Sequence, residues 1–351
     1  MTSIRPVFLA ALAVFALSRT AHAQWIAQTS GTTNELRGLS VVSPQVAWAS
    51  GQRGTVIHTV DGGATWLRDT VAGATTLDLR AIAGISATTA HAISIGDSSR
   101  IYRTTDGGKT WSLRFAATRK GTFFDAIRFW DPQHGIAVSD PVDGHFVLVT
   151  TNDGGDTWAE LPGQSIPPAI AGDGSFAASG SCLEVHGTND VWFVTGGAAV
   201  ARVFHSGDRG KTWTVSDSPI RAGIASAGIF SIAFRDATHG AIAGGDYTKP
   251  ALGGRNMALT ADGGRTWTVV DSTSAPPGFR SAVTYVPTTN GRSMVAVGLN
   301  GTDVSNDGGK TWSPVDATAY NSVQFASPTA GYTVGPRGRV AKWTGTFAPK
   351  P

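Results

Sequence analysis

The sequence predicts an all-β chain folded as a seven-bladed β-propeller of four-stranded antiparallel blades. One short motif recurs six times at a nearly constant spacing, and the same order of β-rich segments surrounds every copy. Repeats of about 20–50 residues are typical of solenoids, propellers and arrays. The segments outside the six copies supply one further blade, which brings the expected number to seven.

The repeated motif has the form [ST]-x-D-x-G-x-T-W, with its aspartates 45 to 55 residues apart. Its copies are TVDGGATW (59–66), TTDGGKTW (104–111), TNDGGDTW (151–158), SGDRGKTW (206–213), TADGGRTW (260–267) and SNDGGKTW (305–312). The aspartates are Asp61, Asp106, Asp153, Asp208, Asp262 and Asp307, and the tryptophans are Trp66, Trp111, Trp158, Trp213, Trp267 and Trp312.

Each residue type in the motif has a structural task. Glycine supplies the positive φ angles of a tight hairpin, and the aspartate accepts hydrogen bonds from turn amides. The Ser or Thr hydroxyl can brace the turn. The tryptophan is expected to open the outer strand of the blade and to bury its ring against a neighbouring blade. We therefore interpret the six aspartates and six tryptophans as structural rather than catalytic.

The segments between the motifs read as strands. In the first repeat LRGLSVV, QVAWASG and TVIHTV are short β-rich runs separated by turn residues, and no region shows sustained helical spacing of apolar residues. After Trp312, three such runs follow without a motif. The segment 24–30, QWIAQTS, resembles the outer strand of the other repeats, so we expect it to complete the seventh blade and close the ring.

The N-terminal segment 1–23 has the pattern of a secretory signal peptide. Arg5 precedes an apolar run from Val7 to Leu17, and the small-residue site Ala21-His22-Ala23 precedes Gln24. The run is too short to span a bilayer. The expected organisation is therefore a signal peptide (1–23), a single propeller (24–347) and a short tail (348–351), in a secreted or periplasmic protein that has no membrane span after cleavage.

Composition narrows the possible functions. The only cysteine is Cys182, so disulfide frameworks and cysteine-based zinc sites are excluded. The net charge of +3 includes Arg5 and Arg19 of the leader, and with no basic run we expect no nucleic-acid partner. The histidines do not cluster, and the Gly-rich strings do not sit between a strand and a helix, so we expect no metal, no cofactor and no phosphate loop. A monomer is expected.

The six motif copies resemble the Asp-box, or BNR, repeat. This repeat occurs in bacterial sialidases, two-propeller xyloglucan hydrolases, sorting receptors and photosystem II assembly/stability-factor-like propellers. Over residues 24–347 the repeat pattern is most similar to the assembly-factor group. That resemblance implies a seven-bladed, non-enzymatic protein that binds a protein or peptide partner, here in assembling or stabilising an envelope complex. It does not imply photosynthesis, because a fold does not fix a function.

The face opposite the motif turns is where we expect function, since binding residues tend to lie on loops of a rigid scaffold. The candidate binding residues on this face are Arg37, Arg80, Asp125, Asp140, Asp143, Asp246, Tyr247 and Arg280. The arginines can hold a carboxylate of a partner chain, or they can be paired with Asp78, Asp125 or Asp140. Asp140 and Asp143 could also contribute to a Ca²⁺ site, although two carboxylates are few.

The alternative function is glycoside hydrolysis of the sialidase type on the same face, with carbohydrate as the ligand. That chemistry requires an arginine cluster and a tyrosine nucleophile paired with an acid. Tyr247 is the one tyrosine in a suitable loop, and Glu184 is a conceivable partner. The Arg-Ile-Pro motif of sialidases is absent near Gln24. Hydrolysis of the xyloglucan type calls for two propellers, and its two carboxylates would have to come from Asp125, Asp140, Asp143 or Asp246.

Overall fold

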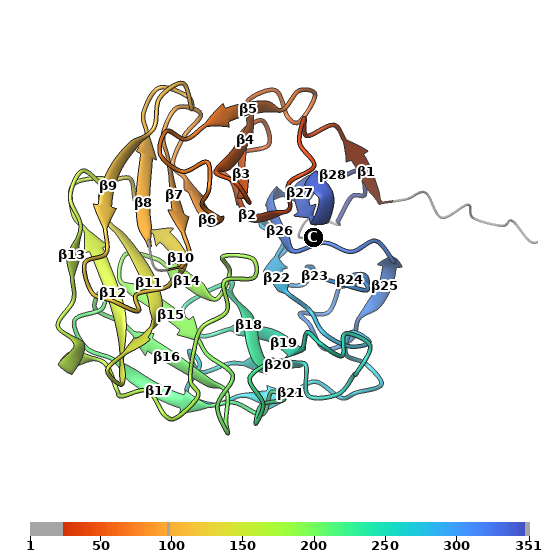
Figure 1. Cartoon of the computed structure of the whole chain (residues 1–351). Coiled ribbons are helices and arrows are strands. Elements are labelled where there is room, and N and C mark those ends of the chain that lie inside the picture. The colour runs from red at the N-terminus through yellow and green to blue at the C-terminus, as the bar shows by residue number, and fades with distance from the viewer. Residues whose placement is uncertain (1–23, 97–98, 348–351) are drawn as a thin grey trace, which may run out of the picture.

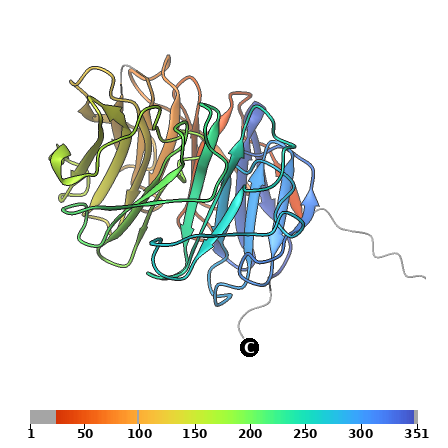
Figure 2. The same cartoon turned by 90° about the horizontal axis from the view of Figure 1, so that it is seen from below.

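Seven four-stranded antiparallel sheets are arranged around a central axis in the computed structural model, which describes residues 24–96 and 99–347 (Figure 1). In six sheets, the strands follow one another from the axis to the rim in chain order. The first strands of neighbouring sheets contact each other all the way around the ring. Seen from the side, the strands run between the two faces of the ring (Figure 2).

Each of these six sheets is a blade formed by a continuous stretch of chain. Blade 1 consists of β2 (Leu36–Val41), β3 (Ala47–Gly51), β4 (Thr55–Thr59) and β5 (Leu67–Thr70). Blade 2 consists of β6 (Leu79–Gly84), β7 (Ala90–Ser94), β8 (Arg100–Thr104) and β9 (Ser112–Ala116). Blade 3 consists of β10 (Phe124–Phe129), β11 (Gly135–Val142), β12 (His145–Thr151) and β13 (Ala159–Glu160), and is followed by the 3-10 turn η1 (Gly163–Ser165).

The next three blades keep the same order. Blade 4 consists of β14 (Leu183–His186), β15 (Asp190–Val194), β16 (Arg202–Ser206) and β17 (Thr214–Asp217). Blade 5 consists of β18 (Ala227–Phe234), β19 (Gly240–Asp246), β20 (Met257–Thr260) and β21 (Thr268–Val269). Blade 6 consists of β22 (Ala282–Tyr285), β23 (Met294–Gly298), β24 (Gly301–Ser305) and β25 (Ser313–Asp316).

Blade 7 joins the two ends of the described chain, as the sequence predicts. Its strands are β26 (Ser322–Ser327), β27 (Ala330–Gly335), β28 (Arg339–Trp343), with η2 (Pro336–Gly338) before β28, and the N-terminal strand β1 (Trp25–Gln28). β1 pairs antiparallel with β28, with Trp25 opposite Trp343. The predicted seven-bladed fold and its closure by the N-terminal strand are therefore confirmed.

The motif turns have the hydrogen bonds expected of them. In blade 1, Thr59 Oγ1 donates to Asp61 Oδ1 at 2.8 Å and accepts from the Gly63 amide at 2.9 Å. Thr65 donates from its amide and from its hydroxyl to the Asp61 carboxylate, at 2.9 and 2.6 Å. These bonds, led by the Thr65 hydroxyl, lower the pKa of Asp61 to about 2. Gly62 and Gly63 have φ angles of 72° and 82°, which favour glycine.

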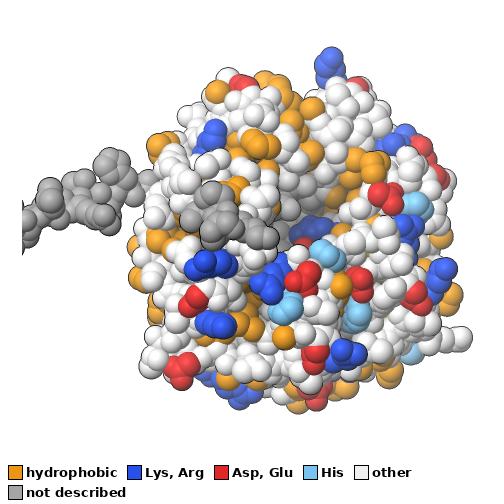
Figure 3. Space-filling model, turned by 180° about the vertical axis from the view of Figure 1, so that it is seen from behind, with side chains coloured by type: hydrophobic (Ala, Val, Ile, Leu, Met, Phe, Trp, Pro, Cys, Tyr) orange, Lys and Arg blue, Asp and Glu red, His pale blue; other side chains and the backbone are white. Residues whose placement is uncertain are grey.

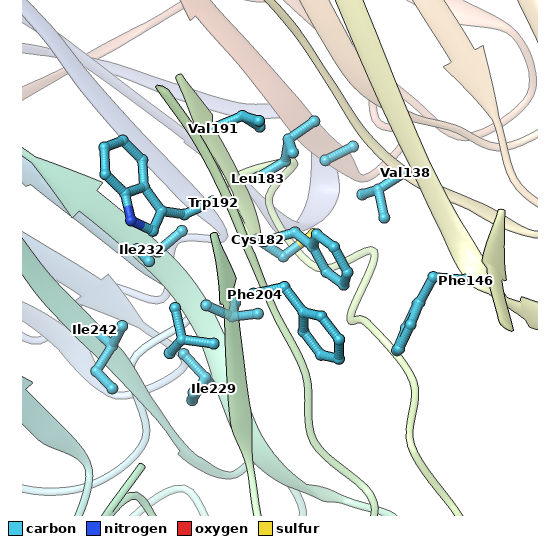
Figure 4. Packing of buried hydrophobic residues seen from close by; sticks show 14 of the residues in the cluster. Val138, Phe146, Cys182, Leu183, Val191, Trp192, Phe204, Ile229, Ile232 and Ile242 are labelled. Atoms are coloured by element: carbon cyan, nitrogen blue, oxygen red, sulfur yellow. The ribbon is translucent and has the colours of Figure 1, made fainter. Parts of the chain in front are cut away.

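The core is made where neighbouring blades face each other. The largest described cluster joins blades 3, 4 and 5, and Figure 4 shows Phe146, Trp192, Phe204 and Ile242 within it. The motif tryptophans add to these contacts: Trp111 of blade 2, for example, meets Trp48 of blade 1 edge to face at 6.2 Å. One detail differs from expectation, because each motif tryptophan lies just before its outer strand rather than inside it.

Some predictions fall outside the described residues. The signal peptide (1–23) and the tail (348–351) both lie there. Within 24–96 and 99–347, no helix has the length and apolar character needed to cross a membrane.

Candidate functional site

The two faces of the ring differ in what they carry. The Asp-box face bears the six motif turns, together with the hairpins that join the first and second strands. The loop face bears the hairpins that join the second and third strands, together with the connections between blades. Figure 1 shows the loop face, and Figure 3 shows the Asp-box face, where charged and histidine side chains gather around a central hollow. All eight predicted binding residues belong to segments near the loop face.

A stretch of the connection between blades 3 and 4 crosses the channel at the loop face. We call residues 176–181 the central segment; its chain lies in the middle of the ring just before β14 (Figure 1). Arg37 of blade 1 donates to the Ala178 carbonyl at 3.2 Å. Ser179 Oγ donates to the Ser281 carbonyl of blade 6 at 2.9 Å. Two blades other than those it connects therefore hold the central segment in place.

The central segment forms one wall of a pocket at the channel mouth. We call this hollow of about 280 Å³ the central pocket. Its lining residues are Arg37, Arg80, Phe176, Ala177, Ala178, Phe230, Tyr247, Phe279, Ser281, Leu299 and Asn321. Of the eight predicted binding residues, the structure brings Arg37, Arg80 and Tyr247 together here.

Both arginines of the central pocket are fixed by neighbours. Arg37 Nη2 lies 2.9 Å from Glu35 Oε1, and Arg80 Nε donates to Asp78 Oδ2 at 2.9 Å. Burial lowers the pKa of Arg37, while Glu35 opposes that shift. Of the acidic partners that the sequence offers to these arginines, Asp78 pairs with Arg80, whereas Arg37 pairs with Glu35 instead. Arg37 Nε is buried without a partner among the described residues, so its guanidinium has a donor left over.

Four aromatic rings line the central pocket, and one of them, Phe176, comes from the central segment itself. Phe176 stacks on Phe230 with ring centroids 3.9 Å apart, and Phe279 meets Phe230 edge to face at 4.7 Å. Tyr247 approaches Phe230 at 6.0 Å and is 46% exposed. A buried aromatic wall with one exposed ring next to guanidinium groups can hold an apolar or aromatic group that carries a polar or anionic end.

Arg280 and Asp246 are not available on the surface of the pocket. Arg280 is 1% exposed. It donates through Nε to Asp303 Oδ2 at 2.7 Å and through Nη1 to Asn300 Oδ1 at 2.6 Å. Asp246 is buried, and its carboxylate accepts hydrogen bonds from the amide and hydroxyl of Thr248. Both side chains hold their own loops in shape, and we leave them out of the candidate site.

The acidic candidates of blade 3 are a buried residue, a half-buried one and an exposed turn residue. Asp125 is fully buried, neither carboxylate oxygen has a described partner, and burial, reinforced by Asp140, raises its pKa well above the ordinary value. Burial also raises the pKa of Asp140 to about 6, although its Oδ1 accepts the Ser175 amide. Asp143 lies at the β11–β12 hairpin with a φ angle of 52°.

The structure does not support the sialidase pair of Tyr247 and Glu184 or the Ca²⁺ site at Asp140 and Asp143. Glu184 lines a different hollow, with Arg128 and Gln324, toward the Asp-box end of the channel. Tyr247 lines the central pocket and Glu184 does not, so the structure does not bring this pair together in one hollow. Among residues 24–96 and 99–347, no group of three His, Cys, Asp or Glu side chains is placed to hold a metal ion.

The aromatic wall is the part of the site that sequence reasoning missed. Phe176 belongs to a loop whose length and glycines mark it as a candidate in the sequence. No feature of the sequence marks Phe230 or Phe279 as binding residues. Each of them lies near the start of an innermost strand, where an apolar residue is ordinary. Only the fold shows that these two blades and the central segment bring the three rings together.

Comparison with known proteins points to the same repeat. A family model described as photosynthesis system II assembly factor YCF48 matches residues 17–117, and one described as BNR/Asp-box repeat matches residues 303–314. The chain is a propeller with Asp-box repeats, and over residues 17–117 it is similar to the photosystem II assembly-factor family. A comparison with curated proteins finds no match.

Solved structures share the propeller over nearly the whole chain. One described as YCF48 bound to D1 peptide has a TM-score of 0.67 at 17% identity, and covers 92% of this chain and 98% of that chain. YCF48 from Cyanidioschyzon merolae has a TM-score of 0.66 at 22% identity, with coverages of 92% and 99%. At these identities the likeness is one of fold alone.

A glycoside hydrolase is also among the similar folds. The GH74 xyloglucanase from Xanthomonas campestris has a TM-score of 0.64 at 15% identity, and the match covers 93% of this chain and 54% of that chain. This Asp-box propeller therefore spans about half of the xyloglucanase.

Proposed function

We propose that this chain is an exported, non-catalytic propeller that binds a protein or peptide partner at the central pocket. The observation that carries the proposal is the geometry of this pocket, where exposed Tyr247 and a phenylalanine wall lie beside two oriented guanidinium groups. Aromatic residues and arginine are the side chains that most often dominate binding energy at protein interfaces. A rigid ring presents them with little loss of conformational entropy on binding.

The size of the central pocket favours a peptide over a carbohydrate chain. Its volume of about 280 Å³ is at the lower limit of small-molecule sites, which are roughly 300–1,000 Å³. Such a pocket suits one anchoring side chain or chain end of a partner, while the surrounding loops contact the rest. Arg37 and Arg80 then orient a carboxylate or carbonyl of that anchor.

We further propose that the partner belongs to an envelope complex that the propeller helps to assemble or stabilise. Support comes from the match to an assembly-factor family model over blades 1 and 2. A similar propeller is described as bound to D1 peptide, which is consistent with a peptide-binding role for this architecture. Export is proposed from the signal-peptide pattern of residues 1–23.

Glycoside hydrolysis is the alternative, and the likeness to a GH74 xyloglucanase is the observation that favours it. The geometry opposes it. Tyr247 has no acid beside it in the lining of the central pocket. Asp125 is closed off from solvent, and a hydrolase needs two carboxyl groups that reach the substrate.

The proposal is tested by comparing pocket variants with a surface control. Proteins captured from a periplasmic extract are identified, and the purified candidate is titrated against wild type, Tyr247→Ser, Arg80→Gln and Arg292→Gln. Arg292 is exposed on the Asp-box face, so it is the control. We expect each pocket variant to weaken binding by about tenfold or more, as hot-spot truncations do, and the control to change it little.

An activity assay separates the two functions. Wild type and Tyr247→Phe are incubated with fluorogenic sialosides and with xyloglucan. Turnover by wild type that is lost in the variant would contradict the binding proposal and support the hydrolase. In the titration, equal binding by wild type, both pocket variants and the control would also contradict the binding proposal, because the central pocket would then play no part.

A further inference from the structure

A second hollow lies on the ring where blade 7 meets blade 1. We call it the seam groove; its volume is about 890 Å³. One wall is the continuous run of residues 27–34, which leads from β1 to β2. The other walls come from Arg53, Arg68 and Thr75 of blade 1 and from residues 337–340 of blade 7. None of these residues lines the central pocket, so the inference does not rest on the function proposed above.

The seam groove has an unbalanced positive charge. Four arginines line it, namely Arg53, Arg68, Arg337 and Arg339, and no aspartate or glutamate does. Arg53, Arg68 and Arg337 are exposed and make no ion pair with any residue that the structure describes. Arg339 donates only to the Ala319 carbonyl, at 2.9 Å. This differs from the central pocket, where each arginine has an acidic neighbour.

Two of these arginines occupy the same place in neighbouring blades. Arg53 follows Gln52 in the β3–β4 hairpin, and Arg337 follows Pro336 in the β27–β28 hairpin; each precedes a glycine. Their φ angles are 55° and 57°, in the left-handed region that favours glycine and asparagine. The turn itself therefore does not require arginine at either position, yet both positions supply a guanidinium to one groove.

The rest of the lining indicates which anion fits. It contains hydroxyl and amide side chains, including those of Thr29, Thr33 and Asn34, but no aromatic ring on which a base could stack. Ala27 and Gln28 belong to β1, which pairs only with β28 and so leaves its other edge unpaired within the described sheet. Extended peptides bind at such edges through their main chain.

We propose that the seam groove is a docking site for an acidic, extended polypeptide segment of a partner. The carboxylates of the segment bind the four guanidinium groups, which match carboxylates in a bidentate geometry. Its main chain contacts the amide and hydroxyl groups of residues 27–34. The volume of the groove accommodates several residues rather than a single ion. Since three of the four arginines are exposed, this binding weakens as ionic strength rises.

The test uses fluorescence anisotropy with a labelled glutamate-rich dodecapeptide. The double variant Arg53→Asn/Arg337→Asn removes two charges, and asparagine tolerates the left-handed backbone. Lys109→Asn/Arg292→Asn removes two charges from the exposed Asp-box face and is the matched control. We expect the first variant to lose about tenfold or more in affinity and the control less than about twofold, since interface charges act locally under screening. Equal denaturation midpoints establish that all variants are folded.

Three further ligands and one further variant decide between ligand classes. A glutamine-rich dodecapeptide is expected to bind much more weakly than the acidic one, and Tyr247→Ser is expected to leave binding of the acidic peptide unchanged. Equal binding of the two peptides overturns the proposal, as does an equal loss in the control variant. Tighter binding of a polygalacturonate oligosaccharide, or full displacement of the peptide by millimolar inorganic phosphate, would assign the groove to a different anion and also overturns it.

Discussion

The indole of Trp25 meets the indole of Trp343 edge to face, with ring centroids 5.0 Å apart. Trp25 lies in the first described strand and Trp343 ends the last one, so this contact joins the two ends of the described propeller. Trp25 also packs against Tyr320 and Phe325, both at 6.1 Å. Blade 7 thus has its aromatic cluster at the closure of the ring.

Replacement of Trp25 with alanine should destabilise the ring strongly. Trp25 is 4% exposed, whereas Ile26, next to it on the same strand, is 56% exposed. Truncation of a buried tryptophan costs about 3–5 kcal/mol, and we expect a loss of this size in the free energy of unfolding measured by urea denaturation. Ile26→Ala is the control and should change it by less than about 0.5 kcal/mol. Equal values for the two variants would refute closure by β1.

The anchor of the central segment is a buried ion pair. Asp173 precedes this segment and pairs with Arg202 of blade 4; both side chains are nearly or fully buried. Asp173→Ala leaves the Arg202 charge unpaired, and we expect it to cost about 3–5 kcal/mol of stability. Asp143→Asn, at an exposed turn of blade 3 where asparagine tolerates the left-handed backbone, is the control. Urea denaturation gives the costs, and limited proteolysis should cut the central segment only in Asp173→Ala; resistance in that variant would contradict the anchoring role.

Glu184 should make the stability depend on pH. Partial burial raises the pKa of Glu184, whose side chain is 27% exposed, to about 7 from an ordinary 4.5, although Arg128 lies 3.8 Å away. Between these pKa values the folded protein holds a proton that the unfolded chain has released. The stability that this proton provides is therefore complete below pH 4.5 and is lost as the pH rises through 7.

The corresponding measurement is denaturation of wild type and Glu184→Gln at several pH values. We expect wild type to lose on the order of 1–3 kcal/mol more than the variant between pH 5 and pH 8. Asp140, whose pKa is raised to about 6 by burial, adds a slope of the same sign that both proteins keep. Glu160→Gln, on the exposed strand β13, is the control. Parallel pH profiles for wild type and Glu184→Gln would show that Glu184 is not protonated in the folded state.

Cys182 should be inert in the folded protein. It is fully buried, and burial raises the pKa of its thiol well above the ordinary value. Since the thiolate is the reactive form, we expect a thiol reagent to modify wild type only as fast as the protein unfolds. The engineered Tyr247→Cys protein, with an exposed position, should react at once at one site. Rapid modification of wild type would show that solvent reaches the interior of blade 4.

The ring was predictable because its determinants are local. The hydrogen bonds around Asp61 join residues at most four positions apart, so each copy of the eight-residue motif can form the same turn by itself. The position of β1 was predictable because the segment 24–30 resembles the outer strands of the other repeats. The architecture of such a repeat can therefore be predicted from the sequence.

The candidate site was predictable only in part, because its contacts join distant segments. Phe176 stacks on Phe230, 54 residues later, and nothing near either residue indicates that contact. Arg280 was expected at the surface but is enclosed by Asp303 and Asn300, which lie beyond the next strand. Arg37 and Arg80 were identified correctly as members of one cluster, since equivalent positions on neighbouring blades lie side by side.

The central claim is that a partner binds at the central pocket, and site-specific photocrosslinking tests it most directly. A photoreactive phenylalanine analogue is placed at Tyr247 on the loop face or, as a control, at exposed Val60 on the Asp-box face. The account predicts one dominant adduct with a single envelope protein from position 247, lost when Arg80→Gln is added, and no such adduct from position 60. The same adduct from both positions, or one that persists with Arg80→Gln, would contradict it.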